Sequence, residues 1–77
     1  MKVTILKWAK KAMARMPKNE QQRIAEAIFK LPGGDVKSLK GEPNGFRLRV
    51  GKWRVIFQKF DDELIIRDIG TRGGIYK

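Results

Sequence analysis

The sequence predicts one small α+β domain, in which a short strand, two helices and an antiparallel sheet follow one another along the chain. Its 77 residues are enough for a single modest core and too few for a second domain. In the first half the apolar residues repeat at helical spacing, and in the last third they alternate with polar residues. We therefore expect a short N-terminal strand, a helical hairpin and a three-stranded antiparallel meander packed on the helices, with residues 1–77 forming one domain.

The composition excludes several classes of function. Cysteine and histidine are both missing, which removes disulfides, Cys/His zinc sites, thiol nucleophiles and imidazole acids or bases. Catalysis would have to use Arg, Lys, Tyr, Asp, Glu, Ser or Thr, and we expect neither a metal nor a cofactor. No apolar run approaches the length of a membrane span, and the N-terminus lacks the layout of a signal peptide. We expect a cytoplasmic protein that binds no membrane.

The charge of the chain indicates an anionic partner. Eighteen Lys and Arg against eight Asp and Glu give a formal net charge of +10, and this self-repulsion destabilises a compact state unless a negative partner relieves it. The alternative is that basic residues only keep a small domain soluble. We expect nucleic acid, and RNA phosphates in particular, or an acidic protein as the partner.

The first half of the chain predicts one strand and two helices. Residues 2–6 are β-prone, and residues 8–16 have apolar side chains at helical spacing. Pro17 cannot continue that helix, and Asn19 is expected to cap a second helix over residues 20–31.

The second half predicts a loop and then three strands. Residues 34–45 are rich in Gly, Ser, Pro and Asn and are expected to form a connecting loop. Residues 46–50 and 53–57 alternate in polarity on either side of a two-residue turn that begins at Gly51, and residues 64–69 form the third strand.

Gly51 at the first turn position favours a type II′ turn, which fixes the register of the hairpin. Val50 then lies opposite Trp53, and Arg49 lies opposite Arg54. This register divides the side chains into an apolar face and a cationic face. The apolar face carries Phe46, Leu48, Val50, Trp53, Val55 and Phe57, and the cationic face carries Arg47, Arg49, Lys52 and Arg54.

The expected pairing of Arg49 with Arg54 favours an anion-binding role. Like charges directly opposite on adjacent strands cost roughly 0.2–1 kcal/mol, whereas a charge-assisted hydrogen bond to phosphate contributes about 1.5–3 kcal/mol. We therefore expect a negative group between the two arginines. The alternatives are that the arginines extend apart into water, or that acidic residues of a protein partner take the place of phosphate.

Four segments of the sequence resemble a known family. They are residues 39–41 (LKG), 45–51 (GFRLRVG), 53–57 (WRVIF) and 69–72 (IGTR), the last followed by Ile75 and Tyr76. In these motifs, and in its expected order of elements, the chain resembles the RelE toxin family over nearly its whole length. The resemblance implies a type II toxin that cleaves mRNA in the decoding site of the ribosome without a metal. It also implies an acidic cognate antitoxin as partner, and operator DNA bound through the toxin-antitoxin complex.

The resemblance also implies roles for individual residues. The basic residues of the family before and after the turn correspond to Arg47, Arg49 and Arg54, and its tail residues correspond to Arg72 and Tyr76. Arg49, Arg54 and Arg72 are expected to clamp the scissile phosphate. Tyr76 is expected to act as general base, with general acid or base-stacking residue as alternatives. RNA binding is assigned to Arg47, which would hold a neighbouring phosphate, and to Lys52 in the turn.

Two other functions remain open at the level of sequence. The ParE branch of the same fold poisons DNA gyrase and is not a nuclease, and fold alone does not separate the two branches. A non-catalytic RNA-binding module would also need only basic charge and an aromatic-containing sheet.

Overall fold

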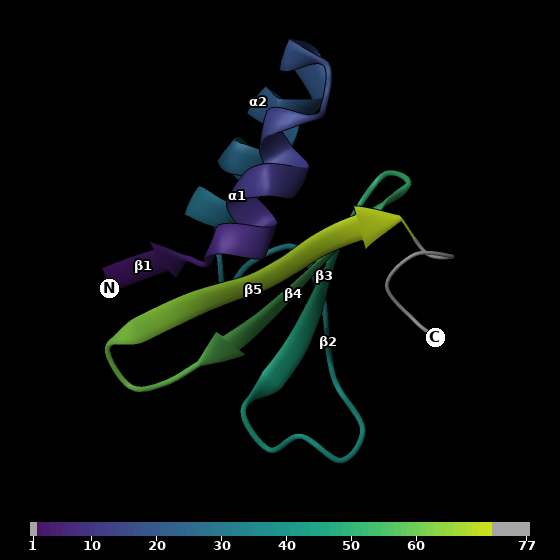
Figure 1. Cartoon of the computed structure of the whole chain (residues 1–77). Coiled ribbons are helices and arrows are strands. Elements are labelled where there is room, and N and C mark those ends of the chain that lie inside the picture. Colours follow the sequence, from purple (N-terminus) through teal and green to yellow (C-terminus); the bar gives the residue numbers. More distant parts are fainter. Residues whose placement is uncertain (1, 72–77) are drawn as a thin grey trace.

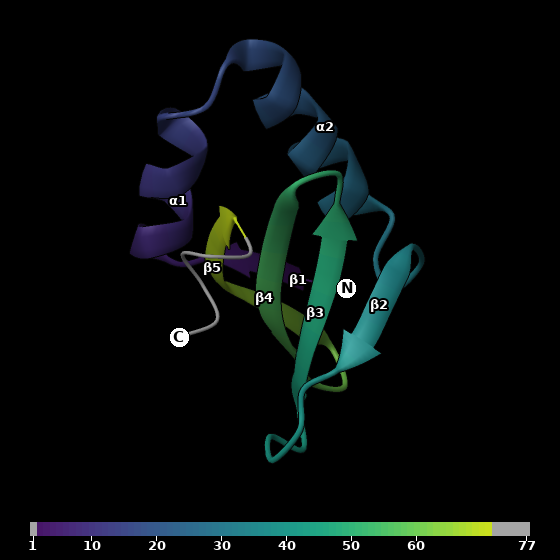
Figure 2. The same ribbon diagram turned by 90° about the vertical axis from the view of Figure 1, so that its right-hand side faces the viewer.

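The structure is a computed structural model that describes residues 2–71, in which two helices pack over one side of a five-stranded sheet (Figure 1, Figure 2). The strands lie in the order β1-β5-β4-β3-β2, with β1 parallel to β5 and the other neighbours antiparallel. No helix in this part of the chain is long and apolar enough to cross a membrane. The elements are β1 (Lys2–Ile5), α1 (Lys7–Ala14), α2 (Lys18–Phe29), β2 (Asp35–Ser38), β3 (Gly45–Val50), β4 (Trp53–Lys59) and β5 (Glu63–Thr71).

The α+β class is confirmed, but the expected loop over residues 34–45 is wrong in its first part. Asp35–Ser38 forms the edge strand β2, which pairs antiparallel with β3 and extends the expected meander to four strands. Only Val36 of this strand packs against the core, opposite Leu48. A four-residue edge strand with one inward apolar side chain has too little local pattern to predict, because it is stabilised by pairing with β3 and not by its own sequence.

The two helices are confirmed, with corrections at their ends. The first helix ends at Ala14 and not at Met16, although Met16 is still buried in the core. The second begins at Lys18, and Pro17 rather than Asn19 is its N-cap residue. The Pro17 carbonyl accepts a hydrogen bond from the Gln21 amide at 3.0 Å. Proline fits this position because the amide hydrogen that it lacks would have no helical partner there.

The register of the β3–β4 hairpin is confirmed. Val50 pairs with Trp53 and Arg49 pairs with Arg54. Gly51 has a φ of 59°. Within the described residues, only glycines have a positive φ. A positive φ at the first turn residue and not at the second is the pattern of a type II′ turn.

A β-bulge between β4 and β5 controls which residues of β5 face outward. Ile56 pairs with Asp68 while Phe57 pairs with Ile66, so Arg67 is the extra residue of β5. An extra residue reverses the alternation of side chains along a strand. Past the bulge, Ile69 therefore lies on the core side, and Asp68 and Gly70 lie on the opposite face.

The core lies between the helices and one face of the sheet. Its largest fully buried side chains come from α2 and from the three central strands, as the period-two pattern predicts. We call the face of the sheet that packs against the helices the inner face, and the opposite face the outer face. These side chains are Phe57, Ile24, Leu48, Leu64, Ile66 and Val55.

A matched pair of isoleucines on β5 tests this division of the faces. Ile66 is fully buried in the core, whereas its neighbour Ile65 is only half-buried. We expect Ile66→Val to lower the free energy of unfolding by about 1 kcal/mol and Ile65→Val by about half of that or less. Urea denaturation followed by circular dichroism measures both values. A larger loss for Ile65→Val would show that the faces are assigned the wrong way round.

Candidate functional site

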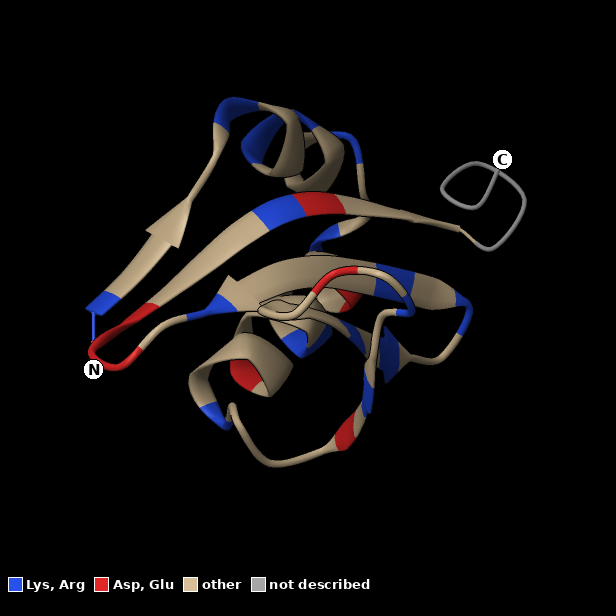
Figure 3. Ribbon diagram, turned by 90° about the horizontal axis from the view of Figure 1, so that it is seen from below, with Lys and Arg blue, Asp and Glu red and all other residues tan. Residues whose placement is uncertain are grey.

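The expected site residues gather around the β3–β4 hairpin. Arg47 and Arg49 lie on β3, Lys52 lies in the turn and Arg54 lies on β4. Figure 3 shows Lys and Arg segments on neighbouring strands of the sheet. Arg72 and Tyr76 lie outside the described residues, so their roles stay predictions.

Arg49 is held by a carboxylate that the sequence analysis missed. Its Nε donates a hydrogen bond to Oδ2 of Asp35 at 2.7 Å. Asp35 lies directly opposite Arg49 because β2 pairs with β3. The negative group expected beside the arginines is therefore already supplied in part by the chain itself, on the β2 side of Arg49 rather than between Arg49 and Arg54. With residues 34–45 assigned to a loop, no signal pointed to Asp35.

Arg47 is less accessible than its expected role suggests. Its side chain is only 12% exposed, and its Nη2 lies 4.0 Å from Oδ1 of Asp35. It lies between Lys37 of β2 and Ile56 of β4 in the register of the sheet. A phosphate on the surface would therefore reach Arg47 less readily than Arg49, whose side chain is 54% exposed.

Arg54 is oriented by the backbone of the turn. Its Nη1 donates to the carbonyl oxygens of Gly51 at 3.4 Å and Trp53 at 3.3 Å. Within residues 2–71 it forms no salt bridge, so no carboxylate of this region offsets its charge. The residue paired with it on β5 is Gly70, which brings no side chain to the outer face beside Arg54.

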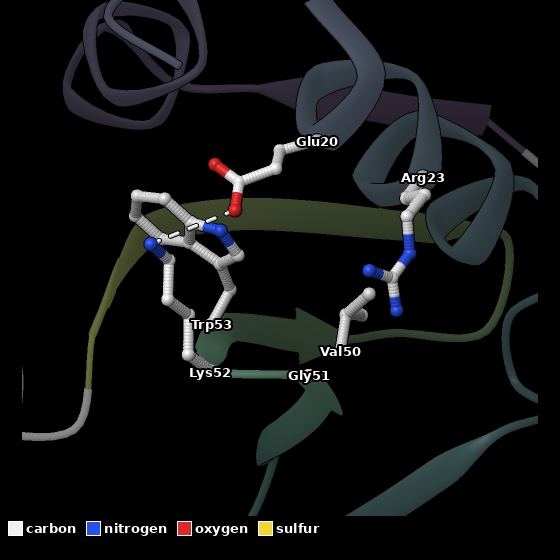
Figure 4. Close-up of a pocket in the computed structure, with 6 residues that line it drawn as sticks. All are labelled: Glu20, Arg23, Val50, Gly51, Lys52 and Trp53. Carbon is white, nitrogen blue, oxygen red and sulfur yellow. Dashed lines mark ion pairs between the residues drawn. The ribbon is translucent and has the colours of Figure 1, made fainter. Parts of the chain in front are cut away.

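The expected place of Lys52 on the cationic face is wrong, because its ammonium lies on the helix side of the sheet, in a small pocket between the turn and α2. Its Nζ lies 3.5 Å from Oε1 of Glu20 and 5.5 Å from the centre of the Trp53 ring. Figure 4 shows the Glu20 carboxylate pointing from α2 toward the Lys52 ammonium and the indole. The pocket has a volume of about 240 Å³ and also includes Arg23. Glu20 was assigned only to a core helix in the sequence analysis, and its link to the turn is visible only in three dimensions.

Trp53 has an unusual polar atom in this pocket. Its Nε1 is buried and has no hydrogen-bond acceptor within the described part of the chain. A buried donor without a partner costs about 1–3 kcal/mol. The Trp53 ring is therefore packed for its apolar contact with the core rather than for its hydrogen bond, and it anchors the β4 side of the turn.

A larger hollow of about 640 Å³ lies beyond the hairpin, on the outer side of β4 and β5. Trp8 is 70% exposed there, although the sequence analysis placed it only at the start of a helix. Aromatic residues are enriched at protein-protein interfaces, so Trp8 makes this hollow a candidate docking surface. The hollow is lined by Leu6, Trp8, Leu39, Lys40, Glu42, Ile56, Arg67 and Asp68.

The site offers guanidinium and ammonium groups for anion binding, and these groups differ in their exposure to solvent. Arg49 is exposed and Arg54 is half-buried, and the two lie directly opposite each other on the hairpin. Exposed salt bridges such as that of Lys52 contribute only about 0–1 kcal/mol, so an arriving phosphate can displace them. In the region that the structure describes, no three Asp or Glu side chains gather closely enough to hold a metal ion.

Comparison with solved structures places this fold among RelE proteins. A chain of the RelB-RelE antitoxin-toxin complex of Methanococcus jannaschii matches with a TM-score of 0.81 and 26% identity, over 95% of this chain and 94% of that chain. The archaeal RelE-RelB complex of Pyrococcus horikoshii matches with a TM-score of 0.75 and 27% identity, over 95% and 96%. The RelBE2 complex of Mycobacterium tuberculosis, at 20% identity and a TM-score of 0.78, shows the shared fold over 92% of this chain and 96% of that chain.

Comparison of sequences gives a shorter match. A segment of 45 residues is 44% identical to RelE1 of Methanocaldococcus jannaschii, which is described as a candidate toxin. The match covers 56% of this chain and 50% of that protein, so the chain spans about half the length of this relative. No family model matches the chain.

The fold and the basic hairpin define a small α+β domain with one core face and one cationic face. The chain is RelE-like in structure and in sequence, which confirms the resemblance seen in its motifs.

The turn at Gly51 generates the first test of this site. A side chain at φ 59° is strained, and the nearest atom to an added Cβ is Arg23 Nη2 at 3.6 Å, so backbone strain is the main cost. We expect Gly51→Ala to lower the free energy of unfolding by about 1–2 kcal/mol. Lys52→Ala, at the next turn position, is the control and should cost less than about 1 kcal/mol. Equal losses in urea denaturation would contradict the assigned turn.

Proposed function

We propose that this chain is the toxin of a RelBE-type toxin-antitoxin system and cleaves mRNA on the ribosome as an endoribonuclease. The observation that supports this most is the Arg49 and Arg54 pair, which the hairpin register places face to face on the outer side of the sheet. Likeness to chains of RelB-RelE complexes supports the toxin assignment. The catalytic part of the proposal rests on the chemistry of the arginines and on the family resemblance.

The proposed reaction is an internal transfer at phosphorus. The ribose 2′-oxygen forms a bond to the adjacent phosphorus, the bond from phosphorus to the 5′-oxygen breaks, and a cyclic phosphate and a free 5′-hydroxyl result. Negative charge develops on the phosphoryl oxygens along this path, and fixed guanidinium groups stabilise it without a metal ion. A base must accept the 2′-hydroxyl proton and an acid must protonate the leaving oxygen.

The geometry of the described residues indicates which cations are best placed to stabilise the negative charge that develops on the phosphoryl oxygens. Arg54 is oriented by turn carbonyls that leave its positive charge uncompensated by any carboxylate within residues 2–71. Arg49 is exposed and fixed at Nε, which suits a fork onto two phosphate oxygens. Arg72 is proposed as the third clamp. Arg47, whose side chain is only 12% exposed, and the turn residue Lys52 are proposed to contact neighbouring phosphates.

The proposed partner besides RNA is an acidic antitoxin. The net charge of +10 makes the isolated chain self-repulsive. An acidic partner that binds the folded chain and not the unfolded chain would stabilise the fold by mass action. The outer hollow with the exposed Trp8 offers apolar contact beside two basic and two acidic side chains. Operator DNA would be bound through the complex of toxin and antitoxin.

Mapping of RNA ends tests the proposed activity directly. We expect expression of the wild-type chain to create new 5′-hydroxyl ends on translated transcripts and not on untranslated ones. Arg54→Ala should reduce these ends by about 10²-fold or more, because it removes a group that stabilises the transition state. Lys59→Ala, at the far end of β4, is the control for lost charge and should keep nearly full activity.

Other outcomes of this experiment would select the alternatives. Growth arrest without new RNA ends would contradict cleavage and indicate a gyrase poison of the same fold. RNA binding without cuts in any transcript would indicate a non-catalytic binding module.

Tyr76 provides a separate test of the chemical step. If Tyr76 transfers a proton, Tyr76→Phe should slow cleavage by about 10²–10⁴-fold while RNA affinity changes little. Single-turnover cleavage of ribosome-bound mRNA, measured across protein concentrations, gives the rate and the affinity separately. A full cleavage rate in the variant would leave Tyr76 with a stacking role only.

A further inference from the structure

We propose that Asp35 is a positioning residue that holds Arg49 in the orientation in which it binds phosphate. This inference rests on the proposed function and adds to it a group from an edge strand that carries none of the expected site residues. Asp35 is the first residue of β2 and pairs in register with Arg49 of β3.

The geometry shows one carboxylate shared by two arginines of the same strand. Oδ2 of Asp35 accepts the Nε hydrogen bond of Arg49 at 2.7 Å, a short, charge-assisted contact. Oδ1 lies 4.0 Å from Nη2 of Arg47. Because Arg47 and Arg49 are two positions apart on β3, both project from the outer face, and Asp35 lies beside them.

The attachment at Nε leaves the end of the guanidinium for a ligand. Within the described chain, neither Nη atom of Arg49 forms a hydrogen bond, and the side chain remains 54% exposed. A guanidinium that is fixed through Nε presents its two terminal nitrogens in one direction, which suits bidentate binding of a phosphate through these two atoms. Asp35 therefore restricts the rotation of Arg49 without covering its ligand-binding edge.

The backbone before Asp35 is built to keep it in this place. Gly34 has a φ of 108°, and a Cβ there would lie 3.1 Å from the Leu48 side chain. The chain therefore enters β2 in tight contact with the core residue that neighbours Arg49 on β3. The position of Asp35 follows from this close approach and from the β2–β3 pairing.

A positioning carboxylate and a merely competing carboxylate predict opposite kinetics. The charge of Asp35 repels phosphate, so its removal should leave RNA affinity unchanged or increase it. If Asp35 only competed with phosphate for Arg49, cleavage would also become faster. If Asp35 positions Arg49, the chemical step becomes slower although binding is as tight or tighter, because small misplacements of a catalytic group are costly.

The test uses the full chain with Asp35→Asn, Asp35→Glu and the control Asp61→Asn. Asp61 is exposed in the turn that follows β4, whereas Arg49 pairs with Arg54 near the start of β4, so the Asp61 variant removes the same charge at the other end of the strand. In single-turnover cleavage of ribosome-bound mRNA we expect Asp35→Asn to lower the rate by about tenfold or more with an unchanged or lower Kd. Asp35→Glu should recover part of the rate, and Asp61→Asn should keep it within about twofold. A rate for Asp35→Asn equal to or above that of the wild type would overturn the proposal.

A second measurement does not depend on cleavage. In ¹⁵N NMR spectra of the full chain, the Arg49 Nε–H should exchange with water more slowly than that of the exposed Arg15 in the wild type. Asp35→Asn should remove this protection, whereas Asp61→Asn should keep it. Titration with inorganic phosphate should then shift the Arg49 side-chain signals by similar amounts in the wild type. In Asp35→Asn we expect the Arg49 guanidinium to rotate, so the shifts should differ from one signal to the next.

The two measurements separate this proposal from the proposed function. Absence of RNA cleavage by the wild type, together with protection of Arg49 that needs Asp35, would reject the nuclease and retain Asp35 as the group that orients Arg49. Equal exchange rates in the wild type and Asp35→Asn would reject the positioning role whether or not the chain cleaves RNA.

Discussion

The two-residue turn at Gly51 is the constraint on which the rest of the site depends. Side chains of a strand alternate between faces, so a slip of one residue in the hairpin would exchange the core and the cationic face. With Gly51 at φ 59°, Leu48 and Val55 face the helices while Arg49 and Arg54 face outward as a pair. The same turn supplies the carbonyl of Gly51 that orients Arg54. One register therefore sets both the core face and the arginine pair.

The bulge in β5 continues the division into a core face and an outer face on the strand next to β4. A regular continuation from Ile66 would place Gly70 on the core side and Ile69 on the surface. The extra residue Arg67 reverses this, so that Ile69 is buried and Gly70 lies beside Arg54. A glycine at that position keeps the outer face open at the arginine pair. β5 ends at Thr71, and the proposed tail residues Arg72 and Tyr76 lie outside the described residues.

Local patterns predicted the helices, the hairpin register and the presence of arginines on the outer face, because spacing and turn chemistry act over a few residues. They did not predict the parallel pairing of β1 with β5, whose partners Lys2 and Glu63 are distant in sequence. They also missed β2, where Val36 alone of four residues packs inward. The carboxylates beside the cations were missed for the same reason, since Asp35 and Glu20 become neighbours of Arg49 and Lys52 only through tertiary pairing.

Arg54, Lys52 and Arg49 of the hairpin are each held by a different part of the fold. Turn carbonyls orient Arg54, α2 supplies Glu20 to Lys52, and β2 supplies Asp35 to Arg49. Exposed ion pairs of this kind add little to the free energy of folding, so stability alone gives weak reason to keep them. Fixing long, flexible side chains before a ligand arrives lowers the entropy that binding must overcome. By this reasoning β2 contributes mainly to the geometry of the site, and the core contributes the stability that keeps β2 in place.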